Sequence, residues 1–227
     1  VYKNVYAFIT PSEFLKKKLS LNGFEEKRIH CIPTFTASKT TIGEQQIGSY
    51  GLYFGRVTEE KGVETVIKAY EKLPEYTVKI MGDDTTDEAK RLKKYVENHK
   101  MKNVEFLGFK SGAELENVIK GARFTLIPSI WYDNLPNTAL ESFQYSKPVI
   151  ASNIGSLPEL VIDGENGYLF KPSNVEDLIR KIKMLDDDTL VKKMGQASRK
   201  RLESRFAPQT HYEDLMKIFN EAVKSRK

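Results

Sequence analysis

The sequence has a single cysteine and only three histidines among 227 residues. One cysteine cannot form an internal disulfide, and this scarcity fits a reducing compartment, so we expect a cytoplasmic protein. The histidines, His30, His99 and His211, show no metal-ligand spacing with Cys31 or with carboxylates. The composition therefore argues against a disulfide-stapled fold, and we expect no metal site.

Long apolar runs are also missing. No stretch approaches the ~20 apolar residues that a helix needs to cross a bilayer, and the first residues show no signal-peptide pattern. Apolar residues make up 40% of the chain and charged residues 30%, a balance typical of soluble globular proteins. Because the chain begins with Val1 and not with Met, we expect it to be a piece of a longer protein.

Three common nucleotide-binding and hydrolase motifs are absent from the sequence. It contains no G-x-G-x-x-G, no G-x-x-x-x-G-K-[ST] and no G-x-S-x-G. The dinucleotide-binding, P-loop and nucleophile-elbow interpretations therefore lose their main support.

The net charge of +5 is concentrated near the end of the chain. Residues 191–227 hold ten Lys or Arg against four Asp or Glu, whereas residues 1–190 hold 26 against 27. This distribution favours a solvated basic helix face and predicts no nucleic-acid binding. Peripheral contact with an anionic membrane or a lipid-linked substrate is the alternative interpretation.

Short runs typical of β-strands alternate with stretches that have the apolar spacing of helices. In one of these stretches Val63, Val66, Ile67 and Tyr70 share a face. This alternation predicts an α/β fold, a doubly wound parallel sheet with helices on both faces. The end of the chain shows helical patterns only, and Pro208 is expected to start a new helix. The predicted strands lie at residues 6–10, 29–33, 51–54, 77–81, 103–108, 124–129, 148–152 and 167–170.

One predicted strand ends at Gly55, and two cations, Arg56 and Lys61, follow it. A strand that ends in glycine and leads into a helix is where α/β folds hold anionic ligands, because backbone N–H groups and the helix dipole point there. Two cations at such a place suit a diphosphate. On this stretch alone, ordinary surface charges are the simpler explanation.

A second candidate site lies at the start of a later helix, which we expect to begin at Pro136. The amides of Asn137 and Thr138 would then lack acceptors in the first turn and would suit a phosphate. Asp133 lies in the loop before this turn, and Glu141 lies in the helix eight residues later. Two acids at that separation arise by chance in a chain with 31 acidic residues, so the pair alone proves nothing.

The segment PSIWYDNLPNTALESFQYSKPVIAS closely resembles the signature of family-4 retaining glycosyltransferases, which have the GT-B fold. That signature has a loop acid and a helix Glu separated by seven residues, followed by Pro-Val-Ile-Ala. The resemblance extends in the family's order over roughly residues 1–205. Its other parts are GLYFGRVTEEKGVETVIKAY, NVEFLGFKSGAELENVIKGARFTLIPS and SNIGSLPELVIDGENGYLFKPSNVEDLIRKI.

The resemblance implies roles for the charged candidates. Arg56 and Lys61 match the family's paired cations on the donor diphosphate, where fixed charge stabilises the departing phosphate without a metal. Glu141 matches the Glu that accepts hydrogen bonds from ribose, and Asp133 matches the acid beside the donor sugar. The remaining predicted donor contacts, which are largely made by backbone, are Gly55, Phe109, Lys110, Asn134, Leu135, Asn137 and Thr138.

The resemblance also implies a division of the chain. Residues 1–35 correspond to a remnant of the N-terminal acceptor domain, 36–48 to a linker, 49–206 to a Rossmann-like donor domain and 207–227 to a returning helix. The expected donor is a UDP- or GDP-sugar ahead of an ADP-sugar, and no other cofactor is expected. The acceptor would be a sugar or lipid-linked sugar, held by the missing domain, in polysaccharide, lipopolysaccharide or glycolipid synthesis.

Two departures from the family pattern leave alternatives open. Asp133 is one methylene shorter than the usual Glu, which puts its reach in question, and Ser156 replaces a frequent second glycine. A non-catalytic sugar-nucleotide-binding module and a GT-B-related epimerase are the rival interpretations. Gly155 is expected to be a turn glycine. Trp131 and Tyr132 fit a sugar pocket and packing at a domain face equally well.

Overall fold

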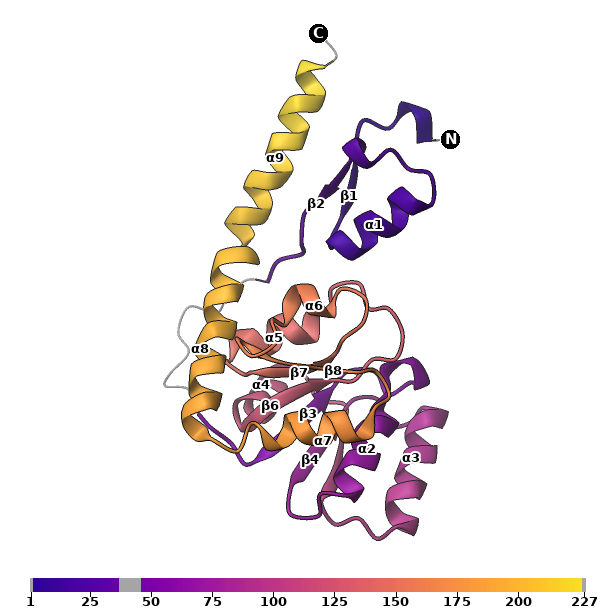
Figure 1. Ribbon diagram of the computed structural model, residues 1–227, viewed down its shortest axis with the longest axis vertical. Helices are drawn as coiled ribbons and strands as arrows, with labels where there is room; N and C mark the ends of the chain where they lie inside the picture. Colours follow the sequence, from indigo (N-terminus) through magenta and orange to yellow (C-terminus); the bar gives the residue numbers. More distant parts are fainter. Residues whose placement is uncertain (1, 37–45, 226–227) are drawn as a thin grey trace.

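The computed structural model describes residues 2–36 and 46–225. Its centre is a six-stranded parallel sheet in the order β5-β4-β3-β6-β7-β8 (Figure 1). This order reverses between β3 and β6, and doubly wound sheets bind ligands outside the carboxyl ends of their strands at such a point. The strands are β3 (Tyr50–Phe54), β4 (Thr77–Met81), β5 (Val104–Gly108), β6 (Ala122–Ile127), β7 (Val149–Ser152) and β8 (Gly167–Phe170).

Helices cover both faces of this sheet, so the predicted α/β fold is confirmed. On one face α2 (Val63–Glu71), α3 (Asp87–Asn98) and α7 (Val175–Lys183) form the largest apolar core with the strands. On the other face lie α4 (Gly112–Lys120), α5 (Asn137–Gln144) and α6 (Leu157–Leu160), together with the end of α8 (Asp188–Arg205). The predicted face of α2, with Val63, Val66, Ile67 and Tyr70, is fully buried in that core.

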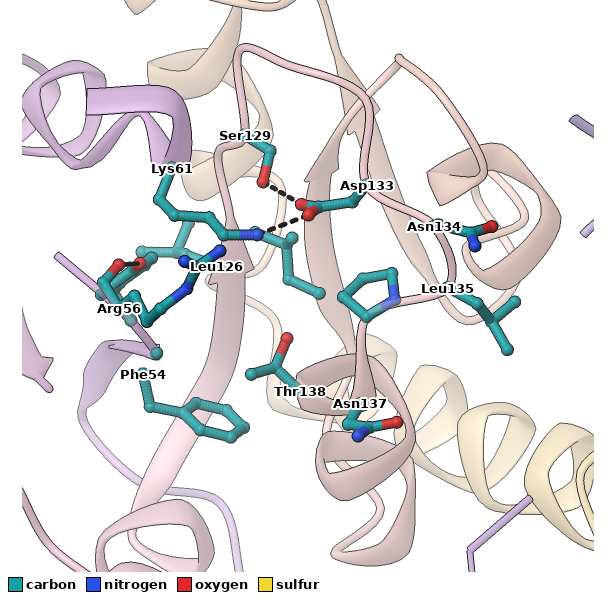
Figure 2. Close-up of a pocket in the computed structure, with 14 residues that line it drawn as sticks. Phe54, Arg56, Lys61, Leu126, Ser129, Asp133, Asn134, Leu135, Asn137 and Thr138 are labelled. Carbon is teal, nitrogen blue, oxygen red and sulfur yellow. Dashed lines mark hydrogen bonds and ion pairs between the residues drawn. The ribbon is translucent and has the colours of Figure 1, made fainter. Parts of the chain in front are cut away.

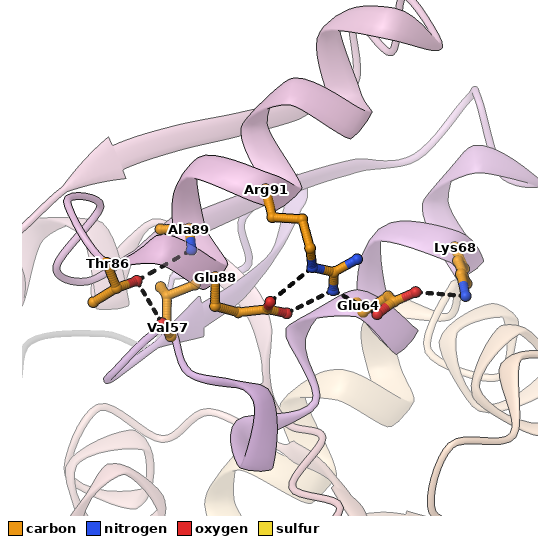
Figure 3. Close-up of polar contacts among 7 residues, drawn as sticks. All are labelled: Val57, Glu64, Lys68, Thr86, Glu88, Ala89 and Arg91. Carbon is orange, nitrogen blue, oxygen red and sulfur yellow. Dashed lines mark hydrogen bonds and ion pairs between the residues drawn. The ribbon is translucent and has the colours of Figure 1, made fainter.

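Polar side chains link α3 to α2 (Figure 3). Thr86 caps the start of α3 and donates a hydrogen bond of 2.7 Å to the Val57 carbonyl. Arg91 of α3 bonds Glu88 in its own first turn at 2.8 Å and Glu64 of α2 at 2.6 Å. Exposed ion pairs of this kind contribute little stability each, so the shared apolar core is what mainly holds the two helices in place.

A second, two-stranded parallel sheet lies apart from the first and consists of β1 (Phe8–Thr10) and β2 (Ile29–Cys31), joined by α1 (Glu13–Leu21). The last helix, α9 (Pro208–Lys224), begins at the predicted proline and extends beside this small sheet (Figure 1). His211 of α9 contacts the Pro33 carbonyl at 2.8 Å. Most of the predicted linker lies outside the described residues, and the assignment of 1–35 to an acceptor domain stays a prediction.

Candidate functional site

Two adjoining cavities lie at the carboxyl ends of the sheet strands. The larger, of about 410 Å³, is formed by residues that follow β3 and β6 and by the start of α5 (Figure 2). The smaller, of about 320 Å³, is formed by residues that follow β3, β4 and β5 and by α5. All of the predicted site residues line one cavity or both. Phe54, Gly55, Arg56 and Thr138 line both and mark the junction.

Glycines let the backbone of neighbouring strands approach closely at this junction. Gly55 has φ +145°, and its N–H donates to the Met81 carbonyl at 3.0 Å. A Cβ atom at Gly82 would lie 2.0 Å from the Gly55 carbonyl oxygen, so only glycine fits there. At Gly55 and Gly82 a ligand can therefore approach the backbone closely, because no side chain covers it there.

The two predicted cations differ in their surroundings. Arg56 is 73% exposed and lies 3.7 Å from Glu60, so its guanidinium is free to turn toward a ligand. Lys61 is only 19% exposed, and its ammonium forms an ion pair with Asp133. The Ser129 hydroxyl donates to the other oxygen of the same carboxylate (Figure 2).

Lys61 and Asp133, which were predicted as separate donor contacts, lie together in the structure although 72 positions separate them in the sequence. The reason is a close contact between the turn after β3 and the loop after β6. Gly62 has φ +67°, and a Cβ there would lie 2.1 Å from the Pro128 carbonyl oxygen. The glycine after Lys61 thus permits the approach that pairs this lysine with the loop acid.

Ser156 holds the backbone around Asp133. Its buried hydroxyl donates to the Asp133 carbonyl at 2.7 Å and accepts from the Leu135 N–H at 2.7 Å. Leu135 needs this support because it has φ +58°, which is uncommon for a residue other than glycine. Gly155, at φ +62°, is the turn glycine that was predicted, and it packs against the same Asp133 backbone. Ser156 thus contributes two hydrogen bonds to the loop.

The start of α5 differs slightly from the prediction. Pro136 occupies the N-cap and not the first helical position, because its ψ of 129° is extended, and the helix begins at Asn137. The N–H groups of Asn137 and Thr138 still fall in the first turn, where an α-helix offers no backbone acceptor. The predicted anion-binding end of the helix therefore faces the same cavity as Lys61.

Glu141 lies one turn further along α5 and lines the smaller cavity. It is half-buried, and this burial raises the pKa of its carboxyl group. No described residue forms an ion pair with it. Phe109, which is 75% exposed, and Lys110 line the same cavity from the end of β5. A carboxylate in a largely apolar pocket is costly, which is typical of a group kept for binding.

Some residues of the site were missed by the sequence analysis. Ser129, Gly82 and Asp83 line the cavities. Ser129 is the last residue of one predicted strand, and Gly82 and Asp83 directly follow another. Their position at strand ends was the signal that could have found them. Conversely, Tyr132 packs against Phe14 of α1 with ring centroids 5.0 Å apart, so the packing interpretation applies to this residue.

Residues 2–36 and 46–225, which the structure describes, include no group of three or more His, Cys, Asp or Glu side chains arranged to hold a metal ion. Within those same positions, no helix is both long and apolar enough to cross a membrane. Metal independence of the reaction stays a prediction.

Comparison with known proteins shows the family to which this chain belongs. The family model described as glycosyl transferases group 1 matches residues 41–201. An uncharacterized glycosyltransferase of Methanocaldococcus jannaschii is 30% identical over 174 residues, which are 76% of this chain and 48% of the relative. A glycogen synthase of Mycobacterium tuberculosis is 31% identical over 186 residues, covering 78% of this chain and 42% of the relative.

The chain therefore belongs to the glycosyl transferases group 1 family. It spans less than half the length of the two curated relatives named above. A solved glycosyltransferase from Rickettsia africae superposes with a TM-score of 0.88 at 21% identity, over 98% of this chain and 66% of that one. Anabaena HepE, solved in complex with UDP and glucose, superposes with a TM-score of 0.83 at 20% identity, over 95% and 63%. These likenesses show the fold, that of GT-B glycosyltransferases.

Proposed function

We propose that this chain is the nucleotide-sugar-binding part of a family-4 retaining glycosyltransferase. The observation that carries the proposal is the pair of adjoining cavities with Arg56 and Thr138 at their junction. A nucleotide sugar also has two bulky ends joined by a diphosphate. The nucleoside fits the smaller cavity, the diphosphate the junction and the sugar the larger cavity.

Each end of this donor would meet a suitable surface. In the smaller cavity the ribose hydroxyls can donate to the Glu141 carboxylate, and the base can lie beside Phe109 and Lys110. In the larger cavity Asp133 and the Asn134 backbone lie where the sugar would be. Hydrogen bonds to a charged carboxylate are stronger than neutral ones, which would offset part of the cost of burying Glu141.

The cations and helix amides would act on the departing group. When the bond from the sugar to the phosphate oxygen breaks, its electron pair goes to that oxygen and adds negative charge to the diphosphate. Arg56, Lys61 and the first amides of α5 surround the position where this charge develops, and fixed positive groups stabilise it in the transition state. The Lys61 ammonium would contact the phosphate on one side while its ion pair with Asp133 holds this ammonium on the other.

We further propose that the whole protein transfers the sugar to an acceptor sugar or lipid-linked sugar, in the cytoplasm, during synthesis of a polysaccharide, lipopolysaccharide or glycolipid. Capsular polysaccharide biosynthesis is what the name of one Staphylococcus aureus relative states of that protein, at 24% identity over 76% of this chain. HepE was solved in complex with UDP and with UDP-glucose, which makes a UDP-sugar the first donor to test.

The test is calorimetry of this chain with UDP-glucose, GDP-mannose and ADP-glucose and with the matching nucleoside diphosphates. We expect the chain to bind one of the three nucleotide sugars and the matching nucleoside diphosphate. The nucleoside alone should not bind. If none of the three sugars binds, the proposal is wrong. In the full-length parent, an NMR spectrum of the product that shows inversion at the anomeric carbon would contradict the retaining assignment.

A second function is favoured by one observation. Both carboxylate oxygens of Asp133 are already engaged, by Lys61 and by Ser129, as they would be in a binding module that does not catalyse transfer. Turnover of donor by the full-length parent would exclude this alternative, whereas tight donor binding without turnover would support it.

A further inference from the structure

Glu159, in the short helix α6, reaches across to the start of α1. Its two carboxylate oxygens accept hydrogen bonds from the Glu13 N–H at 2.8 Å and the Phe14 N–H at 2.7 Å. These are the first two residues of α1, whose amides have no acceptor within the helix and carry the positive end of its dipole. One carboxylate thus satisfies two donors and attaches α1 to the large domain.

The same end of α1 contacts the loop that lines the donor cavity. Ser12, the buried N-cap of α1, accepts from the Leu15 N–H at 3.1 Å and donates to Asn134 Oδ1 at 3.0 Å. Figure 2 shows the Asn134 side chain directed away from Lys61, so its amide serves this contact while its backbone lines the cavity. Tyr132 adds ring contact with Phe14 and lies 4.9 Å from the Lys18 ammonium.

The opposite side of this loop is held by the segment that carries Glu159. Ser156, three residues earlier, binds the backbone of Asp133 and Leu135. Asn134 therefore lies between two supports: Ser156 fixes its neighbours, and Ser12 fixes its side chain. Glu159 joins the supports, because it holds α1 in the position from which Ser12 can reach Asn134.

We propose that Glu159 is a positioning residue for the donor site, which it orders by docking α1 against the loop of residues 131–135. Glu159 lines neither of the two cavities, so it acts on them through Ser12 and Asn134. The effect on the donor rests on the proposed function. Thermodynamic linkage makes this effect reciprocal. If docking of α1 strengthens donor binding by a given factor, donor binding must stabilise the docked α1 by the same factor.

Two natural reporters make the docking measurable without a ligand. Trp131, the sole tryptophan of the chain, lies beside Tyr132 on the loop, with ring centroids 5.3 Å apart. Cys31, the sole cysteine, lies at the end of β2. Burial raises the pKa of its thiol to about 12, with further contributions from Glu13 and Glu159, so alkylation in the docked state should be slow.

The experiment compares Glu159→Gln with Glu165→Gln, which removes the same charge from an exposed position on the same segment. Trp131 is already 65% exposed in the docked structure, so its fluorescence anisotropy, which reports the order of the loop, is the signal to follow. We expect this anisotropy to fall in Glu159→Gln and to stay unchanged in Glu165→Gln. Phe14→Ala, paired with Leu21→Ala at the exposed end of α1, repeats the test without a change of charge near Cys31. Iodoacetamide should alkylate Cys31 about fivefold faster in Phe14→Ala than in Leu21→Ala. If the anisotropy of Trp131 and the alkylation of Cys31 match the controls in both pairs, the proposal is overturned.

Calorimetry then tests the effect on the donor. UDP-glucose binding should weaken about fivefold in Glu159→Gln while UDP binding changes less than twofold, because Asn134 lies on the sugar side. UDP-glucose should also slow alkylation of Cys31 in the native chain and not in Glu159→Gln. Equal affinities of the native chain and Glu159→Gln for UDP-glucose would overturn the positioning role. If the native chain binds no nucleotide sugar, the proposed function and the positioning role both fail, whereas the reporter variants still decide whether Glu159 docks α1.

Discussion

The shared carboxylate of Asp133 is the feature at residue scale that bears most on the chemistry. Its shorter side chain raised the question of what it can reach, and the structure answers that it reaches Lys61 and Ser129. An opposite charge in direct contact orients the lysine and also lowers the positive potential that a phosphate would meet. The two residues therefore form one unit, in which the acid positions the cation.

This pairing predicts opposite effects of two substitutions on UDP binding. Lys61→Ala should weaken it at least about tenfold, because a charge-assisted contact with the diphosphate is lost. Asp133→Asn should strengthen it about threefold, because the ammonium is no longer partly neutralised. Lys68→Ala, at an exposed cation on α2, is the matched control and should leave affinity unchanged. Calorimetry with UDP and uridine decides: weaker UDP binding in Asp133→Asn would show that the acid does not compete for Lys61.

The carboxylate of Glu141 is half-buried, and no described residue forms an ion pair with it. Burial raises its pKa above the value in the unfolded chain, so the folded state binds a proton at this group more tightly than the unfolded state does. Above the raised pKa the burial penalty is fully present, and it disappears as pH falls below about 4.5, the ordinary pKa of Glu. A group that costs stability at neutral pH is expected where binding requires it.

Glu141→Gln should therefore stabilise the chain and weaken nucleotide binding at the same time. We expect the free energy of unfolding at pH 7 to rise by about 0.5–1 kcal/mol. This gain should shrink toward zero as pH falls through the raised pKa to below about 4.5. Urea titrations at several pH values measure the first effect and calorimetry with UDP the second. A gain that persists unchanged at low pH would show that ionisation of Glu141 is not its cause.

At the scale of secondary-structure elements, the sequence predicted every strand of both sheets. Parallel strands are buried on both faces and appear as short continuous apolar runs, as in β7, whose four residues are all buried. The carboxyl ends of the strands then place the site. What could not be predicted are contacts between distant segments, such as Lys61 with Asp133 and Glu159 with α1, because no local pattern encodes them. Ser156 was noticed only as a departure from a glycine.

Lys147, between α5 and β7, is another long-range contact of this kind. It is 1% exposed, and its ammonium donates to the carbonyls of Gln46, Lys120 and Ala122 at 2.6–2.7 Å. These carbonyls belong to three separate segments, so one side chain ties together the approach to β3, the end of α4 and the start of β6. A buried cation with all of its protons satisfied is a structural device.

Lys147→Met should cost about 3 kcal/mol of unfolding free energy, because three buried carbonyls lose their donor while the apolar stem is kept. Guanidinium chloride titration measures this cost, and Lys120→Met, at a nearby cation whose side chain is partly exposed, is the matched control. A loss below about 1 kcal/mol would mean that water replaces the ammonium at these carbonyls. UDP affinity should change little in the variant that folds, since Lys147 lines neither cavity.

For the molecule as a whole, the uneven charge acquires a structural explanation. Two cations of the basic end of the chain are used inside the fold: Arg199 donates to the Gln144 carbonyl at 2.9 Å, and Arg201 donates to the Glu159 carbonyl. Others, such as Arg205 and Lys217, lie near Asp214. The composition alone could not separate these packing roles from an anionic surface partner. The structure thus favours the structural interpretation for part of the basic excess.

The site as a whole also predicts how the donor diphosphate is neutralised. Arg56, Lys61 and the start of α5 converge on one cavity. These fixed positive groups can do the work of a divalent cation at a diphosphate. UDP-glucose should therefore bind with the same affinity, within about twofold, in EDTA and in about 5 mM magnesium. Millimolar magnesium is on the order of magnitude at which weak metal sites bridged by phosphate become occupied. Calorimetry under both conditions is the measurement.

The variant Arg56→Ala provides the contrast. If magnesium restores UDP-glucose binding to this variant and leaves the affinity of the native chain unchanged, the cation and the metal are interchangeable, as charge neutralisation requires. A native chain that binds UDP-glucose only with magnesium would show that its own positive groups do not suffice, and metal independence would be wrong.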